Sequence, residues 1–214
     1  MQELKFIDNY YQKIVNGIDK NNLKNIIGLQ DKIDIYTKLY KYCTLDDTHT
    51  DKLYKKYKDL LIEYSKKISI LSKDDILNKL TLFVKKYNQL VKYLYFAFNY
   101  LDKHYIKHND LLNLNSELSD QILLDNVFIK NKNLIADYIN YNIDNIRNNN
   151  YQNISILLEE SNINTFLRLL DKIGNKINNK NDNKINNKNI LNIINNCIIS
   201  NSLEYNIKIS NITY

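Results

Sequence analysis

The feature that most constrains the fold is a run of apolar side chains, three or four residues apart, from Ile76 to Tyr105. This spacing is that of one face of an α-helix, and it continues for about thirty residues. The chain contains no proline, the residue that most strongly breaks a helix. The sequence therefore predicts one long central helix, opened by a capping box formed by Ser72 and Asp75.

The same helical spacing recurs along most of the remaining chain. It predicts a first helix through Phe6, Tyr10, Ile14 and Ile18, a second at 29–43, a third from Leu53 to about Leu71, and further helices at roughly 115–129, 132–147 and 151–172. Strand-like alternation is nearly absent before EYNIKISNITY at the end of the chain. The predicted fold class is therefore all-α, a helical bundle with long helices.

The composition changes after the last of these helices. The segment 173–189 is rich in Asn and Lys and contains the unit NKINNKN twice, which predicts a solvated, low-complexity linker. Residues 190–214 are more apolar, and the pattern assigns them no definite structure. We therefore expect a helical domain at 1–172, a linker at 173–189 and a tail at 190–214.

Charge and composition bear on the class of partner. A net charge of +6 and a pI near 9.0 are compatible with nucleic-acid binding. However, the 30 basic residues are offset by 24 acidic ones that interleave with them along the chain, which is typical of a solvated surface. A basic helical nucleic-acid-binding protein remains the alternative. The abundance of Asn, Lys, Ile and Tyr indicates AT-rich coding.

No sequence motif indicates catalysis, because phosphate-binding, dinucleotide-binding, HExxH and GxSxG patterns are all missing. His104 and His108 are four residues apart and could share a metal ion, with Asp102 and Asp110 close in sequence. No third ligand has a defined spacing, so both histidines are interpreted as surface residues. We therefore expect no enzyme activity, no metal and no cofactor.

The sequence also bears on location. Cys43 and Cys197 form no CxxC pair, and the first residues do not resemble a secretory signal. The chain has no uncharged apolar run of the roughly 18 residues that indicate a membrane span. These features predict an intracellular, cytoplasmic protein.

Helix 29–43 has more apolar surface than packing on one core requires. Four of its charged residues, Asp31, Asp34, Lys38 and Lys41, gather on a narrow stripe, and the apolar arc is roughly 160° wide, against roughly 100° for an ordinary surface helix. One part is predicted to face the bundle, and it consists of Ile35, Leu39 and Tyr42. The other part could stay outside for a partner, and it consists of Ile33, Tyr36 and Tyr40. Burial of both parts inside the domain is the competing interpretation.

Four segments, in this order, resemble the N-terminal region of cullins, the scaffolds of modular ubiquitin ligases. They are IYTKLYKYCT (35–44), DKLYKKYKDLLIEYSKK (51–67), YLDKHYIKHND (100–110) and IDNIRNNNYQNISILL (143–158). The first is similar to the LYxxVYxxCT stretch of the second cullin helix, and is closest to the cullin that serves Skp-type adaptors. The resemblance spans about residues 5–160 and implies a cullin-repeat helical bundle.

In cullins, the second and fifth helices lie side by side and dock the substrate adaptor, a Skp- or BTB-fold protein. Position by position, the resemblance marks eight residues as adaptor-binding: Lys32, Ile33, Tyr36, Tyr40, Asn99, Tyr100, Lys103 and His104. Leu101 and Tyr105 are expected to hold the fifth helix to the bundle. Many cullins have an aromatic residue where this chain has Lys32, a departure that could weaken binding or favour an acidic adaptor.

Nothing in residues 175–214 resembles the cullin C-terminal half, which binds the RING protein. The resemblance therefore implies a truncated, non-catalytic cullin mimic without RING binding, in the host cytoplasm if the source is viral. We expect it to bind a Skp-type adaptor with its F-box protein first, and a BTB or elongin-C adaptor second. Competition with the host cullin would then inhibit or redirect ubiquitylation. A scaffold that recruits another effector through residues 175–214 is the third interpretation.

Overall fold

The structure is a computed structural model that describes residues 4–46, 48–68, 76–109, 111–131, 134–135 and 137. The chain divides into two compact units. One comprises Met1–Ile68 with Leu82–Asn126, and the other Ser69–Thr81 with Val127–Tyr214. The predicted linker, the tail, the helix at 151–172 and the capping box at Ser72 lie outside the described residues, as does nearly all of the helix at 132–147.

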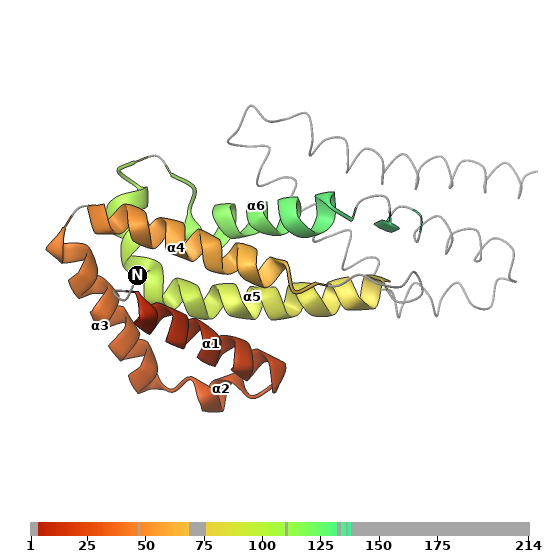
Figure 1. Ribbon diagram of the computed structural model, residues 1–214, viewed down its shortest axis with the longest axis horizontal. Helices are drawn as coiled ribbons and strands as arrows, with labels where there is room; N and C mark the ends of the chain where they lie inside the picture. The colour runs from red at the N-terminus through yellow and green to blue at the C-terminus, as the bar shows by residue number, and fades with distance from the viewer. Residues whose placement is uncertain are drawn as a thin grey trace, which may run out of the picture. The chain divides into compact units, whose positions relative to one another are not determined.

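Every regular element in the described part of the chain is helical, which confirms the all-α prediction (Figure 1). The α-helices are α1 (Lys5–Asp19), α2 (Leu23–Ile26), α3 (Leu29–Leu45), α4 (Thr48–Ser65), α5 (Ile76–Leu101) and α6 (Ser119–Leu123). Among the described residues there are also three π-helical segments: η2 (Asp102–Ile106), η3 (Leu114–Leu118) and η4 (Leu124–Ile129). The long central helix predicted from the sequence is thus α5 together with η2.

Tyrosine side chains hold α4 and α6 against α5. From α4, the fully buried Tyr57 places its ring 5.1 Å from that of Phe98, edge to face, and its hydroxyl donates a hydrogen bond to the Leu114 carbonyl at 3.2 Å. From α5, the Tyr87 hydroxyl donates to the Ser119 carbonyl at 2.9 Å. Because each phenol combines apolar contact with a directional bond, these side chains fix where α4 and α6 sit on α5.

A close approach joins α1 to α2. Gly17 is buried near the end of α1, and a Cβ atom there would lie 2.8 Å from Cδ1 and 3.0 Å from Cα of Leu23. The short helix α2, which the sequence analysis did not predict, can therefore lie against α1 only because residue 17 has no side chain.

The third predicted helix has different ends from those expected. It begins at Thr48, five residues before Leu53, because the Asp46 carboxylate accepts the Thr48 backbone N–H at 2.8 Å and caps the helix. It ends at Ser65 and not near Leu71, and residues 66–67 form a turn. The Ser65 hydroxyl donates to the Ile62 carbonyl at 2.7 Å, which satisfies one of the last carbonyl groups of the helix.

At the end of the central helix, Leu101 and Tyr105 both contact the bundle, but in different ways. Leu101 is buried, as expected, but Tyr105 is half-buried and its hydroxyl donates to the Asp51 carboxylate in the first turn of α4. Ile106 occupies the core position instead. The reason is the wider π-helical turn at Asp102–Ile106, which moves the inward-facing position one residue along the chain.

Candidate protein-docking surface

Helix α3 has the two faces that its sequence indicates. The side chains toward the bundle are buried, and they are Ile35, Leu39, Tyr42 and Cys43. On the outer face the exposed fractions are 46% for Ile33, 37% for Tyr36 and 44% for Tyr40. The competing interpretation, a helix buried on both sides, is therefore wrong for this unit.

The outer face of α3 meets the end of α5. The rings of Tyr40 and Tyr100 lie edge to face with centroids 5.0 Å apart, and the Tyr100 ring stacks on the His104 imidazole at 4.5 Å. Desolvation raises the pKa of the Tyr100 hydroxyl, with further contributions from Tyr40, Cys43 and Tyr36. Three of the eight marked residues, from two helices far apart in sequence, are thus in one chain of aromatic contacts.

Lys32 lies at the other end of this surface. Its ammonium nitrogen is 4.9 Å from the centroid of the Tyr93 ring and 5.8 Å from that of Phe96, which is cation–π distance. No carboxylate in the described part of the chain lies within ion-pair distance of it. Where the resemblance expects an aromatic residue, the structure therefore has a cation seated over two aromatic rings.

The remaining marked residues take less definite positions. Asn99 is partly exposed and Lys103 is exposed, and both belong to the same end of α5 and η2 as Tyr100. Two large apolar residues beside this surface were missed: Leu29, 73% exposed, and Phe96, 44% exposed. Phe96 could have been found, since it lies off the core spacing set by Leu94 and Phe98.

A cavity of about 540 Å³ lies at the His104 end of the surface. Cys43 contributes to its lining, with Asp51 and Tyr105 on the opposite helices. Burial raises the pKa of the Cys43 thiol to about 11, so the thiol is protonated at neutral pH and is a poor nucleophile. Among the residues that the structure describes, no three His, Cys, Asp or Glu side chains are placed to hold a metal ion.

Asp102, which the sequence analysis weighed as a metal ligand, has a structural partner instead. It is buried, and its carboxylate accepts the Leu114 backbone N–H and the Asn113 side-chain amide, each at 3.0 Å. Desolvation raises the pKa of this carboxyl, and the hydrogen bonds partly oppose the shift. Asp102 thus ties the docking end of α5 to the start of η3.

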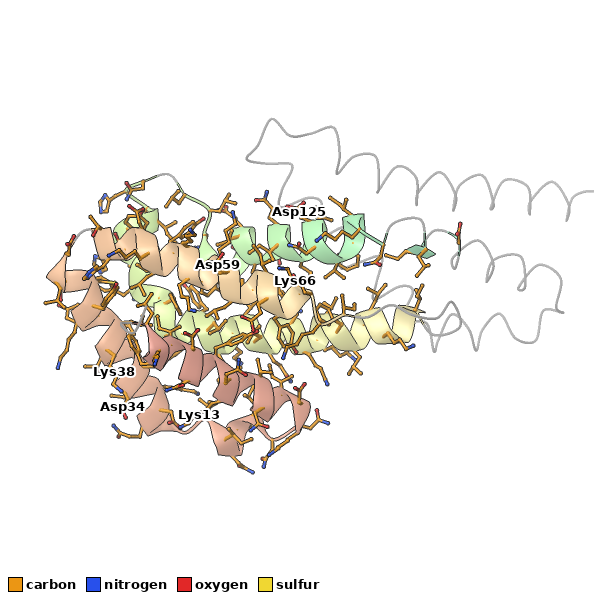
Figure 2. The ribbon with its side chains drawn as sticks, in the orientation of Figure 1. Lys13, Asp34, Lys38, Asp59, Lys66 and Asp125 are labelled. Carbon is orange, nitrogen blue, oxygen red and sulfur yellow. The ribbon has the colours of Figure 1, made fainter. Side chains whose placement is uncertain are left out.

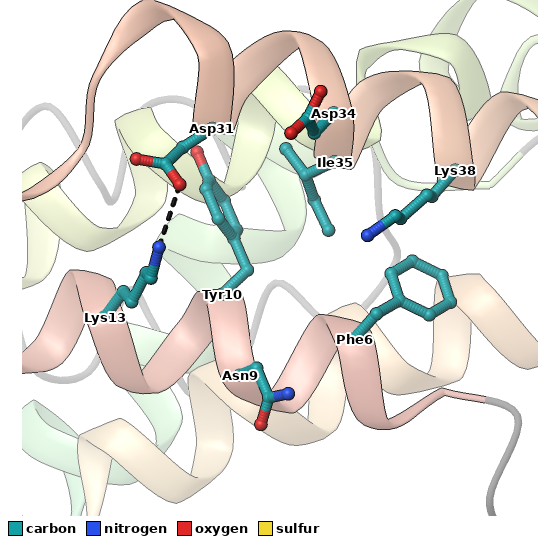
Figure 3. A pocket seen from close by; sticks show the side chains of 8 residues that line it. All are labelled: Phe6, Asn9, Tyr10, Lys13, Asp31, Asp34, Ile35 and Lys38. Carbon is teal, nitrogen blue, oxygen red and sulfur yellow. Dashed lines mark hydrogen bonds and ion pairs between the residues drawn. The ribbon is translucent and has the colours of Figure 1, made fainter.

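The inner side of α3 shows contrasting chemistry. Figure 3 shows a pocket of about 330 Å³ between α1 and α3, in which Lys13 pairs with Asp31 at 2.8 Å. In the same view the Lys38 side chain extends toward the ring of Phe6. Charges of both signs alternate here, and Figure 2 shows Lys13, Asp34 and Lys38 together on this side. We interpret the pocket as the packing seam of α1 and α3.

Comparison with known proteins identifies the family. The family model described as the cullin alpha solenoid domain matches residues 5–204 of the chain. No curated protein matches the sequence. Within the residues described, no helix is long and apolar enough to cross a membrane.

Proposed function

The chain belongs to the cullin family, and on that premise we propose that α3 and the end of α5 bind a ubiquitin-ligase adaptor. The cullin alpha solenoid is a non-catalytic scaffold, whose general role is to hold adaptor proteins. Adaptor binding by Lys32, Ile33, Tyr36 and Tyr40 on one helix, and by Asn99, Tyr100, Lys103 and His104 on the other, is our proposal for this chain.

The proposal rests on the clustering of exposed apolar side chains where α3 meets α5. In the part of the chain that the structure describes, seven large apolar residues are exposed, and five of them flank the contact of α3 with α5: Leu29, Ile33, Tyr36, Tyr40 and Phe96. Clustered exposed apolar side chains are typical of a protein-interaction surface. Tyrosine is well suited to such a surface, because its ring anchors a partner while its hydroxyl keeps contact with water.

Among adaptors we propose the Skp type first, because segment 35–44 resembles the cullin that serves that type. An adaptor held on this face has no room for a second cullin, so the chain would compete with other cullins by mass action. Whether competition inhibits or redirects ubiquitylation depends on what else the chain recruits. A viral or parasitic source stays a prediction from composition.

The direct test is a quantitative pull-down of purified Skp, elongin-C and BTB adaptors by the 214-residue chain. We expect one adaptor class to bind, and Tyr36→Ala and Tyr100→Ala each to weaken it by at least about tenfold, as hot-spot tyrosines do. Leu45→Ala is the matched control, because Leu45 is an exposed apolar residue of α3. Its helical angle places it opposite the docking face. Binding that both tyrosine variants leave intact would show that the adaptor uses another surface.

A reconstituted ubiquitylation reaction tests competition. Adding the chain to a complete cullin ligase should lower substrate ubiquitylation in proportion to adaptor occupancy, and excess adaptor should restore it. The Tyr100→Ala variant should have little effect at the same concentration. Inhibition that excess adaptor does not relieve would contradict competition for the adaptor.

A further inference from the structure

The exposed side of α5 carries lysines without exposed acidic residues among them. Between Ile76 and Asn109 the sequence contains a single acidic residue, Asp102, and that residue is buried. Four residues fall on one stripe of the helix, at spacings of seven, four and seven: Lys85, Lys92, Phe96 and Lys103. All four are exposed. We call this set the α5 stripe.

In the described part of the chain, no salt bridge neutralises the lysines of the stripe. Among described residues, the salt bridges join Lys13 to Asp31, Lys56 to Asp8 and Lys86 to Asp19, and none involves a lysine of the stripe. The acidic residues of α3, Asp31 and Asp34, line the pocket with α1 on the inner side of that helix. The interleaving of charges along the sequence therefore does not extend to this surface.

The α5 stripe is continuous with the proposed docking surface. Lys32 of α3 lies over Phe96, and Phe96 precedes Tyr100 by one helical turn. An ammonium group that lies against an aromatic ring can still pair with a carboxylate of a partner, because the ring contact leaves other N–H donors of the ammonium group free. One surface thus runs from Tyr40 across Tyr100 and Phe96 to Lys92.

We infer that the α5 stripe, together with Lys32, binds an acidic segment of the docked adaptor, which also covers Phe96. The inference rests on the proposed function and extends its contact area beyond the eight marked residues. Unpaired cations around an exposed aromatic ring match a partner whose carboxylates surround an apolar pocket. The exposed aliphatic residues Leu29 and Ile33 on the same surface favour protein over nucleic acid, since they offer no ring for base stacking.

The test measures the affinity of the chain for the adaptor that it retains in the pull-down, at low and at high salt. It uses two variants of the α5 stripe whose substitutions lie outside the eight marked residues. We expect Lys85→Glu/Lys92→Glu to weaken binding about tenfold at low ionic strength, chiefly by slowing association, and much less at high salt. Phe96→Ala should weaken binding about tenfold at either salt concentration. The matched control is Lys55→Glu/Lys58→Glu on α4, where both lysines are exposed, and it should stay within about twofold of wild type.

The results distinguish the proposed docking surface from the acidic contact of the α5 stripe. Loss of binding in Tyr100→Ala, with wild-type affinity in Lys85→Glu/Lys92→Glu and in Phe96→Ala, would overturn the acidic contact and keep the docking surface. Equal losses in the α4 control and the stripe variant would reduce the effect to net charge and also overturn it. If no adaptor binds and a labelled single-stranded RNA does so through Lys85 and Lys92, both the proposed function and this inference fail.

Discussion

Replacing Asp102 with alanine should lower the stability of the first unit by a predictable amount. The variant loses the carboxylate bond to the buried Leu114 amide, and a hydrogen bond to a charged group contributes about 1.5–3 kcal/mol. The bond to the Asn113 side chain is only part-buried, so water can replace it at little cost. Removing a desolvated carboxylate offsets part of the loss, which leaves a net decrease of about 2 kcal/mol.

Thermal unfolding followed by far-UV circular dichroism measures this loss. For a chain of this size, about 2 kcal/mol corresponds to a fall in Tm of about 4–8 °C. Asp59→Ala is the control, because Asp59 is an exposed carboxylate on α4 (Figure 2) and its loss should shift Tm by less than about 2 °C. An Asp102→Ala variant that unfolds at the wild-type temperature would show that the Leu114 bond does not hold η3 in place.

The pH dependence gives a second measurement on the same residue. Because the folded-state pKa of Asp102 is raised above 3.8, ionisation of its carboxyl disfavours the folded state. The proton-linked part of its contribution to stability is therefore fully present below pH 3.8 and is lost as the pH rises through the raised pKa. Asn at this position does not titrate. Wild type should therefore gain stability relative to Asp102→Asn as the pH falls from 7 toward 4. A difference that stays constant or shrinks over that range would contradict the direction of the shift.

The remaining predictions concern close packing and thiol chemistry. Gly17→Ala should lower the free energy of unfolding by about 1–3 kcal/mol, because the new Cβ atom would overlap Leu23. Gly28→Ala is the control and should cost less than about 1 kcal/mol, because its Cβ atom would meet nothing nearer than 3.8 Å. Urea unfolding of both variants measures the two losses, and equal losses would refute the contact with Leu23. In a Cys197→Ser variant, Cys43 should react with a disulfide reagent at pH 8 about 100-fold more slowly in the native state than in urea. The reason is that the raised pKa of the Cys43 thiol lowers the fraction present as thiolate. Equal rates in the two states would show that the thiol is not buried.

Periodicity was sufficient for the parts of the fold in which one helix packs on one core. The angle of 100° per residue predicts one face of α3 with Leu39 and a second with Tyr36, and the exposure of Tyr36 decides that the second face lies outside the bundle. The core line of α5 through Tyr87, Leu94 and Leu101 is confirmed in the same way. In these helices the side-chain pattern and the tertiary packing favour the same arrangement, so local sequence is informative.

Sequence could not give the features that depend on contacts between distant segments. The register change after Leu101 is accompanied by a hydrogen bond from the Leu114 amide to Asp102, a pairing that no spacing rule contains. The contact of Lys32 with Phe96 likewise joins two helices about sixty residues apart, and only the arrangement of α3 against α5 reveals it. The acid-poor side of α5 could have been found from the sequence, because Asp102 is the single acidic residue between Ile76 and Asn109; it was missed because charge was averaged over the whole chain.

The buried tyrosine hydroxyl groups that stabilise the bundle also limit its stability at high pH. Burial raises the pKa of Tyr57 and Tyr87 well above the ordinary value of 10.0, so both stay protonated while the chain is folded. Their stabilising contribution is complete below pH 10 and is lost as the pH rises further, because only the unfolded chain can then release those protons. A core closed by phenylalanine would lack this weakness. Here, strong base should ionise both phenols together as the bundle opens, and the ultraviolet absorbance of the phenolates formed would record the unfolding without any label.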